Sequence, residues 1–196
     1  MFNSGKLVKD LITELKNEVD IAHEIPTATY LTWLTSLEHL CYSEFIKEQR
    51  EITVQNPTET IKIDELPISE DEAPIRFEDI YTVYADDVQL IKSTLASGKI
   101  FPDTFYKHND DLCINTPYAT SEITIVYITR PKIKTDDSGY VMFPTEFLEL
   151  VKAKLRGEAY KLANEDNLSA KWLNDYNILL EHFKVWCNNK ASQFGV

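Results

Sequence analysis

The chain has 196 residues, of which 43% are apolar and 27% charged, which is typical of a globular protein and argues against a disordered one. Its formal net charge of −12 at pH 7 argues against wrapping nucleic acid by phosphate neutralisation. Three widely spaced cysteines give no disulfide framework, the first residues predict no secretory signal, and no apolar run approaches the roughly 18 residues of a membrane span.

Two helices are predicted near the N-terminus. Apolar residues recur at helical spacing from Ser4 to Asp20, with Lys and Glu between them, and Ser4 is a suitable N-cap. A second apolar stripe follows Pro26 and predicts a helix over residues 27–49.

Residues 51–75 differ in character, because acidic residues and prolines dominate the segment. Thr60 to Asp64 alternates and predicts a short strand, whereas the rest is expected to be an exposed acidic loop. The acidic run within this loop is the first candidate for contact with a partner, and it consists of Glu70, Asp71 and Glu72.

The middle of the chain is rich in β-branched and aromatic residues. Asp79 to Tyr84 predicts one strand, and residues 105–107 and 112–115 predict a hairpin across an Asn/Asp turn. The run 122–129 alternates most clearly, and it stops at Arg130 and Pro131.

The C-terminal third returns to helical periodicity. Pro144 suits the first turn of a helix that extends to about Asn164. A final helix, capped by Asp166 or Asn167, carries a heptad-like apolar seam. The seam consists of Trp172, Leu173, Tyr176, Leu179, Leu180, Phe183, Trp186 and Cys187.

Together these patterns predict an α+β fold. Residues 1–50 and 140–190 form a four-helix bundle, and residues 51–139 form an inserted, small antiparallel β region. Residues 191–196 are expected to be a flexible tail, whose Phe194 and Val196 are the second candidates for partner contact. The wide apolar stripes also favour an oligomer.

No motif predicts catalytic, cofactor-binding or metal-binding residues. HExxH, paired Cys/His ligands, GxSxG and a glycine-rich phosphate loop are all absent from the sequence. Cys113 and His108 lie across the predicted hairpin as a conceivable nucleophile and base, but a core thiol beside a turn imidazole is the preferred interpretation. Adjacent acids such as Asp86 and Asp87 fall where turns favour Asp.

Three stretches carry a family resemblance. They are Asp79-Ile-Tyr-Thr-Val-Tyr-Ala-Asp-Asp87, Ile125-Val-Tyr-Ile-Thr-Arg-Pro131, and Phe143-Pro-Thr-Glu-Phe147, which leads through Leu155-Arg-Gly-Glu-Ala-Tyr160 to Trp172-Leu-Asn-Asp-Tyr176. In these stretches the chain resembles the tail tubular protein A family, the head–tail adaptors of short-tailed phages, and the broader group of phage neck ring proteins. The resemblance covers about residues 75–190 and does not include the acidic loop.

The resemblance implies a structural protein without catalytic activity. Such adaptors form a ring, typically of twelve copies, beneath the portal protein and present a platform to the next tail or nozzle ring. Genomic double-stranded DNA passes through their channel without specific binding, and no membrane or cofactor is involved. The expected location is the virion neck, after assembly in the host cytoplasm. An acidic chain suits a channel that repels phosphate.

Two other functions are compatible with the sequence. The first is a small intracellular interaction or assembly module, which would be a monomer or dimer without affinity for a portal. The second is a tail-associated cell-wall hydrolase that uses a pair of carboxylates, since peptidoglycan-degrading activity has been ascribed to some tail tubular proteins.

Overall fold

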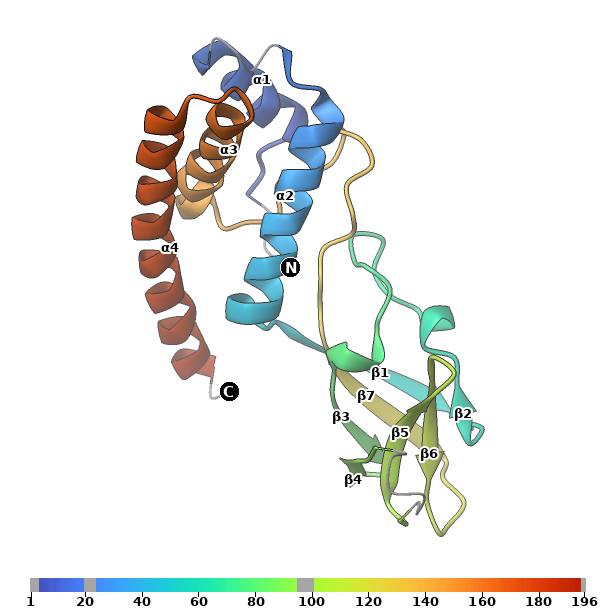
Figure 1. The fold of residues 1–196 in the computed structure, drawn as a ribbon. Helices are drawn as coiled ribbons and strands as arrows, with labels where there is room; N and C mark the ends of the chain where they lie inside the picture. Colours follow the sequence, from blue (N-terminus) through green and yellow to red (C-terminus); the bar gives the residue numbers. More distant parts are fainter. Residues whose placement is uncertain (1–3, 20–23, 95–100, 195–196) are drawn as a thin grey trace. The chain divides into compact units, whose positions relative to one another are not determined.

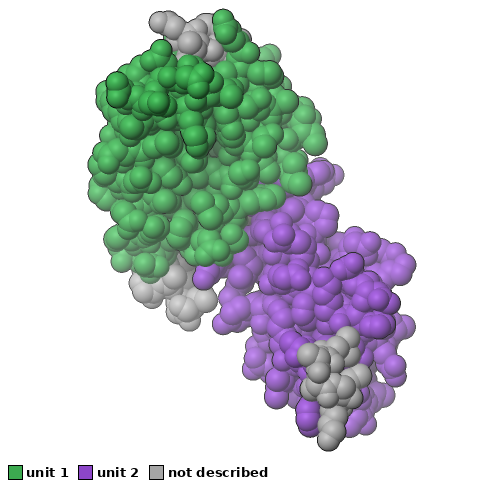
Figure 2. Space-filling model, viewed as in Figure 1, with its two compact units in different colours: residues 1–46, 133–196 green, residues 47–132 purple. Residues whose placement is uncertain are grey.

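The computed structural model describes residues 4–19, 24–94 and 101–194. They form two compact units, which Figure 2 shows in different colours. Unit 1 combines residues 1–46 and 133–196, and unit 2 consists of residues 47–132. Each unit has its own cluster of buried apolar side chains, so each is described by itself.

Unit 1 contains the four predicted helices (Figure 1). Their bounds are α1 Val8–Glu18, α2 Thr27–Cys41, α3 Leu148–Leu162 and α4 Asp166–Phe194. A π-helical turn, Tyr42–Ile46, follows α2, and a 3-10 turn, Thr145–Phe147, precedes α3. The helix predicted over 27–49 therefore ends earlier, and the last helix includes the first residues of the range 191–196.

The start of α1 differs from the prediction that Ser4 caps it. The helix begins at Val8, and the backbone N–H groups of Val8 and Lys9 donate to the carbonyls of Gly139 and Asp137. Ser4 Oγ instead donates to the carbonyl of Val141 at 3.0 Å. Carbonyl groups of a loop that is distant in sequence therefore accept hydrogen bonds from the first N–H groups of α1, which the Ser4 side chain was expected to satisfy.

The core of unit 1 forms where α3 packs against the other three helices. The seam predicted for the last helix is confirmed at its centre, because Tyr176, Phe183 and Cys187 are buried. Phe183 is fully buried and contacts an aromatic cluster, in which three phenylalanine rings lie at edge or tilted angles to it and one tryptophan ring is stacked on it. The cluster comprises Phe45, Phe143, Phe147 and Trp186.

Unit 2 is a seven-stranded sheet that curls into a half-barrel (Figure 1). Its strands are β1 Gln49–Gln55, β2 Thr60–Ile61, β3 Ile80–Ala85, β4 Val88–Lys92, β5 Thr104–His108, β6 Asp111–Asn115 and β7 Glu122–Ile128. The strand order is β1-β7-β3-β4-β5-β6-β2. All neighbours are antiparallel except β4 and β5, which are parallel.

The predicted fold class, a four-helix bundle with a small inserted antiparallel sheet, is therefore wrong. The sheet is mixed, has seven strands and encloses its own core, which includes Val83, Phe105, Leu112 and Ile125. Sequence reasoning missed β1 and β4. Ile52 is the one buried residue of β1 and Leu90 the one buried residue of β4, so neither strand shows a strong apolar pattern.

The acidic segment 51–75 also differs from the exposed loop that we expect. It contains most of β1, all of β2 and a 3-10 turn, Ile63–Glu65. Apolar residues lie between its acidic residues and enter the core. The high acidic content led to the prediction of an exposed loop. The buried apolar residues are Ile52, Ile61, Ile63, Leu66, Ala73 and Ile75.

A close approach between α3 and α4 yields a test of the helical packing. A Cβ atom at Gly157 would lie 2.7 Å from Leu173 Cδ2 and 2.8 Å from its Cγ. We expect Gly157→Val to lower the free energy of unfolding of unit 1 by about 1–3 kcal/mol, because the branched side chain overpacks this crossing. Urea unfolding followed by Trp fluorescence measures this loss, since all three Trp residues lie in unit 1.

The matched control is Gly139→Val, because a Cβ atom at Gly139 meets nothing within 4 Å. It should change the free energy of unfolding by no more than about 0.5 kcal/mol. An equal loss of the free energy of unfolding in the two variants would show that the crossing of α3 and α4 can accommodate a larger side chain at Gly157.

Candidate interaction surfaces

The predicted acidic run is divided by the fold. Glu70 and Asp71 are exposed, but Glu72 is only 3% exposed. The Tyr127 hydroxyl donates to Glu72 Oε2 at 2.9 Å, and Arg50 forms an ion pair with the other oxygen of Glu72. Glu72 is therefore committed to contacts within unit 2, whereas Glu70 and Asp71 remain accessible to a partner.

Backbone hydrogen bonds hold this run against the chain that follows β7. The N–H of Ala73 donates to the carbonyl of Arg130 at 2.8 Å, and the N–H of Lys132 donates to the carbonyl of Asp71 at 2.8 Å. Glu72 and Pro131 form an antiparallel bridge between these bonds. The run thus continues the β ladder for a few residues.

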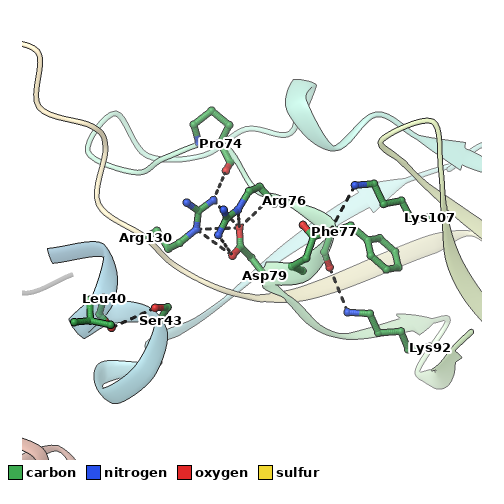
Figure 3. A network of polar contacts seen from close by, with 10 residues as sticks. Leu40, Ser43, Pro74, Arg76, Phe77, Asp79, Lys92, Lys107 and Arg130 are labelled. Atoms are coloured by element: carbon green, nitrogen blue, oxygen red, sulfur yellow. Dashed lines mark hydrogen bonds and ion pairs between the residues drawn. The ribbon is translucent and has the colours of Figure 1, made fainter. Parts of the chain in front are cut away.

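The same region contains a buried ion pair (Figure 3). Arg130 donates through Nε and Nη2 to the carboxylate of Asp79, the shortest distance being 2.7 Å, and its Nη2 also donates to the carbonyl of Pro74. The backbone N–H of Arg76 caps the same carboxylate at 2.9 Å. Burial alone would raise the pKa of Asp79, but the hydrogen bonds from Arg130 and Arg76 outweigh it and hold this pKa below its usual value.

The two predicted C-terminal contact residues receive no structural description of their side chains. Phe194 is the last residue of α4, and Val196 lies outside the described residues. Their proposed role in partner contact stays a prediction.

The structure does not bring the conceivable catalytic pair together. In the β5–β6 hairpin His108 lies opposite Asp111, whereas Cys113 lies opposite Tyr106, two positions away. Cys113 is buried and 3.7 Å from Thr60 Oγ1. Over residues 4–19, 24–94 and 101–194, no group of three or more His, Cys, Asp or Glu residues is arranged to hold a metal ion.

The acidic doublets occupy turns, as their composition predicts. Asp86, Asp87 and Asp110 all have positive φ, between 44° and 70°. The Asp86 carboxylate accepts hydrogen bonds from Ser121 and from the backbone of Glu122, and these bonds lower its pKa. The Asp86 carboxylate therefore connects the β3–β4 turn to the start of β7.

An open hollow of about 340 Å³, lined by residues of β3, β4 and β5, is a candidate contact site. Leu90 and Phe105 are buried at this hollow, whereas Tyr81 and Ile91 beside it are 62% and 69% exposed. We call this site the β3–β4 surface, and its residues are Tyr81, Thr82, Gln89, Leu90, Ile91, Lys92 and Phe105.

The hollow exists because β3 and β4 pair over only part of their length. Their register runs from Val83–Leu90 to Ala85–Val88, after which β4 continues beside β5. Lys92 occupies the place where the strands separate. Its Nζ donates to the carbonyls of Phe77 and Ile80 at 3.3 Å each, and it lies 4.6 Å from the centre of the Phe77 ring (Figure 3).

Few features of the sequence indicate this site. Tyr81 was part of a predicted strand, where aromatic residues are expected, and β4 was not predicted at all. The one available signal is the short run from Val88 to Lys92, which contains three apolar residues after the Asp86–Asp87 turn.

Unit 1 also exposes apolar side chains. Ile178 is 51% exposed and Val185 is 58% exposed on α4. They lie two helical turns apart and therefore on one face, opposite the seam that packs on α3. Leu168, near the start of the same helix, is 40% exposed.

None of the helices in the described part of the chain is long and apolar enough to cross a membrane. No model of a known protein family matches the chain, and no curated protein matches its sequence. Only the surfaces and the sequence patterns therefore bear on its function.

Unit 1 also contains a buried carboxylate. Glu38 of α2 is 0% exposed, and its oxygens meet the backbone N–H of Met142 at 2.8 Å and Nζ of Lys134 at 3.2 Å. Thr35, one turn earlier, accepts a hydrogen bond from the Lys134 backbone. Burial raises the pKa of Glu38 to about 7, although Lys134 and the Met142 N–H both oppose the shift.

The Asp79 network predicts unequal roles for two arginines that bond the same carboxylate. Arg130→Met leaves Asp79 buried without its main counter-ion, and we expect this change to destabilise unit 2 by about 3–5 kcal/mol. Arg76→Met is the control, because the Arg76 side chain is 59% exposed and should contribute no more than about 1 kcal/mol. Amide hydrogen exchange of β3 and β7 measures the loss of stability in both variants. Similar losses for Arg130→Met and Arg76→Met would contradict the conclusion that Arg130 is the main counter-ion of Asp79.

The buried Glu38 predicts a specific pH dependence. Glu38 binds its proton more tightly in the folded state than in the unfolded state, where its pKa has the ordinary value of 4.5. The free energy of unfolding should therefore fall as pH rises from about 4.5 to about 7, by at most about 3 kcal/mol from this group. Glu38→Gln should remove this contribution.

The measurement is Trp-monitored urea unfolding of wild type and Glu38→Gln across this pH range. The stability of wild type relative to Glu38→Gln should decline with pH. Glu44→Gln, which changes an exposed carboxylate nearby, should follow wild type at every pH. A difference between wild type and Glu38→Gln that does not vary with pH would show that Glu38 titrates normally.

Proposed function

We propose that this protein is the head–tail adaptor subunit of a tailed phage. In this proposal, copies of the chain form a ring, of about twelve by resemblance to the tail tubular protein A family, beneath the portal protein. The next tail or nozzle ring binds the other side, and double-stranded DNA passes through the channel. The ring would belong to the virion neck and assemble in the host cytoplasm.

The observation that carries the proposal is the β3–β4 surface. Its open hollow lies between two strongly exposed apolar side chains, Tyr81 and Ile91. Exposed aromatic and aliphatic side chains around a hollow are typical of a surface that receives side chains from another protein. Unit 1 adds a second apolar face on α4, with Ile178 and Val185. A ring subunit needs at least two different contact surfaces, because head-to-tail rings use heterologous contacts.

The charge of the chain supports the same proposal. The net charge of −12 disfavours adhesion to the phosphates of a passing duplex. Glu70 and Asp71 remain exposed on unit 2 and are available to a partner or to the channel.

The proposal is tested by the mass and shape of the assembly. Purified protein, alone and mixed with the portal protein of the same genome, is analysed by size-exclusion chromatography with light scattering and by negative-stain microscopy. We expect rings of about a dozen copies in at least one condition. A chain that remains a monomer with and without the portal would contradict the proposal.

The β3–β4 surface is tested in the same assay. Ile91→Lys places a charge beside the hollow and should weaken ring formation or portal binding by about tenfold or more. Ile133→Lys is the matched control, because Ile133 is 61% exposed but belongs to unit 1 and is not one of the residues of the β3–β4 surface. Equal assembly of both variants would remove this surface from the proposal.

A further inference from the structure

The first strand of the sheet has a free edge. β1 lies at one end of the strand order and pairs with β7 alone. Its pairing is regular, from Gln49 opposite Ile128 to Gln55 opposite Glu122, without a bulge. The other side of this seven-residue strand has no strand beside it among the described residues.

The hydrogen-bond pattern shows which residues face that edge. At the two ends of the ladder, the N–H of Thr129 donates to the carbonyl of Glu48, and the N–H of Asn56 donates to the carbonyl of Ser121. In an antiparallel pair, alternate residues bond to the neighbouring strand and those between them point away. Even-numbered residues of β1 therefore bond to β7, and the backbone groups of the odd-numbered residues point to the free edge. These residues are Gln49, Glu51, Thr53 and Gln55.

This edge lacks most of the features that protect exposed strands. Natural sheets block such edges with proline, bulges, very short strands or inward-facing charges. β2, at the other end of the sheet, is only two residues long. β1 has seven residues, no proline and no bulge, and its one inward-facing charge, Arg50, is neutralised by Glu72.

We propose that the free edge of β1 pairs in antiparallel register with β1 of a second copy of this chain. The register that we propose places Thr53 opposite Thr53 of the second copy and Glu51 opposite its Gln55. All of these residues have edge-facing backbone groups, so each such pair exchanges two main-chain hydrogen bonds.

Side-chain complementarity supports this occupant. On the outer face, β1 already makes the same two kinds of pair with β7, Thr53 with Thr124 at 3.3 Å and Gln55 with Glu122 at 2.9 Å. The proposed register repeats a Thr–Thr pair and a Gln–Glu pair across the new edge. On the inner face it places Ile52 opposite Val54 of the second copy, which extends the apolar surface of the sheet.

Two registers that are shifted toward the start of the strand are less favourable. One that places Glu51 opposite itself brings two carboxylates together, and like charges directly opposite destabilise a sheet. A register that places Ile52 opposite Ile52 of the second copy puts the charged Arg50 opposite the apolar Val54. The proposed register avoids both conflicts.

The inference goes beyond the proposed function and does not depend on it. A pairing of this kind has two-fold symmetry and joins copies in twos, whereas a closed ring needs contacts between different surfaces. The two assemblies differ in mass, so one experiment distinguishes them.

The test is Thr53→Pro, with Thr53→Val as the matched control. Both variants lose the Thr53 hydroxyl and its contact with Thr124, but only proline also removes the N–H that faces the free edge, whereas valine keeps that N–H. The main-chain bonds to β7 come from the even-numbered residues of β1 and are present in both variants. Sedimentation velocity from about 1 µM to about 1 mM should show a wild-type dimer, a dimer of Thr53→Val within about threefold of its affinity, and at least tenfold weaker association of Thr53→Pro.

Amide hydrogen exchange of the wild type gives a second readout that needs no variant. The N–H groups of Glu51 and Thr53 should become protected as concentration rises, whereas those of Ile52 and Val54 should be protected at every concentration. A wild type that stays monomeric, or that assembles without protecting these two amides, overturns the inference. Undiminished dimerisation of Thr53→Pro overturns it as well.

Discussion

The ion pair between Asp79 and Arg130 holds the backbone of unit 2 in place just beyond the ends of the paired strands β3 and β7. Arg130 follows β7 and Asp79 precedes β3, so their contact fixes these two neighbouring strands of the sheet to each other at one end. The residues between β2 and β3 contain little regular structure, and their attachment depends on this pair and on Glu72 with Arg50 and Tyr127. A buried carboxylate is costly unless charge and hydrogen bonds compensate it, and both carboxylates here are compensated.

Unit 1 uses a buried carboxylate differently. Glu38 holds the irregular segment before α3 through one backbone N–H and one lysine, but this compensation is incomplete, which is why its pKa rises. With their irregular segments held in this way, the two units expose apolar side chains on regular elements, β3, β4 and α4. Contact surfaces on rigid elements suit a protein whose proposed role is to occupy a fixed place in an assembly.

Local periodicity predicted the four helices and strands β3, β5, β6 and β7, because each combines strong propensity with clear punctuation. It did not predict β1 or β4, whose exposed faces dilute the apolar pattern, and the fold class was wrong for this reason. The burial of Glu72 could not be predicted either, since its partners Arg50 and Tyr127 are distant in sequence. The β3–β4 surface arises from an incomplete strand pairing, which is a property of the tertiary structure.

The order of the two units along the chain has a consequence for biosynthesis. Unit 2 is continuous in sequence, whereas unit 1 needs residues from both sides of it. On the ribosome, unit 2 can fold as soon as residues 47–132 have emerged, while α1 and α2 still lack α3, against which they pack. The apolar faces of these first two helices therefore remain uncovered during translation of the whole sheet, and this interval is when the nascent chain is most exposed to chaperones and to aggregation.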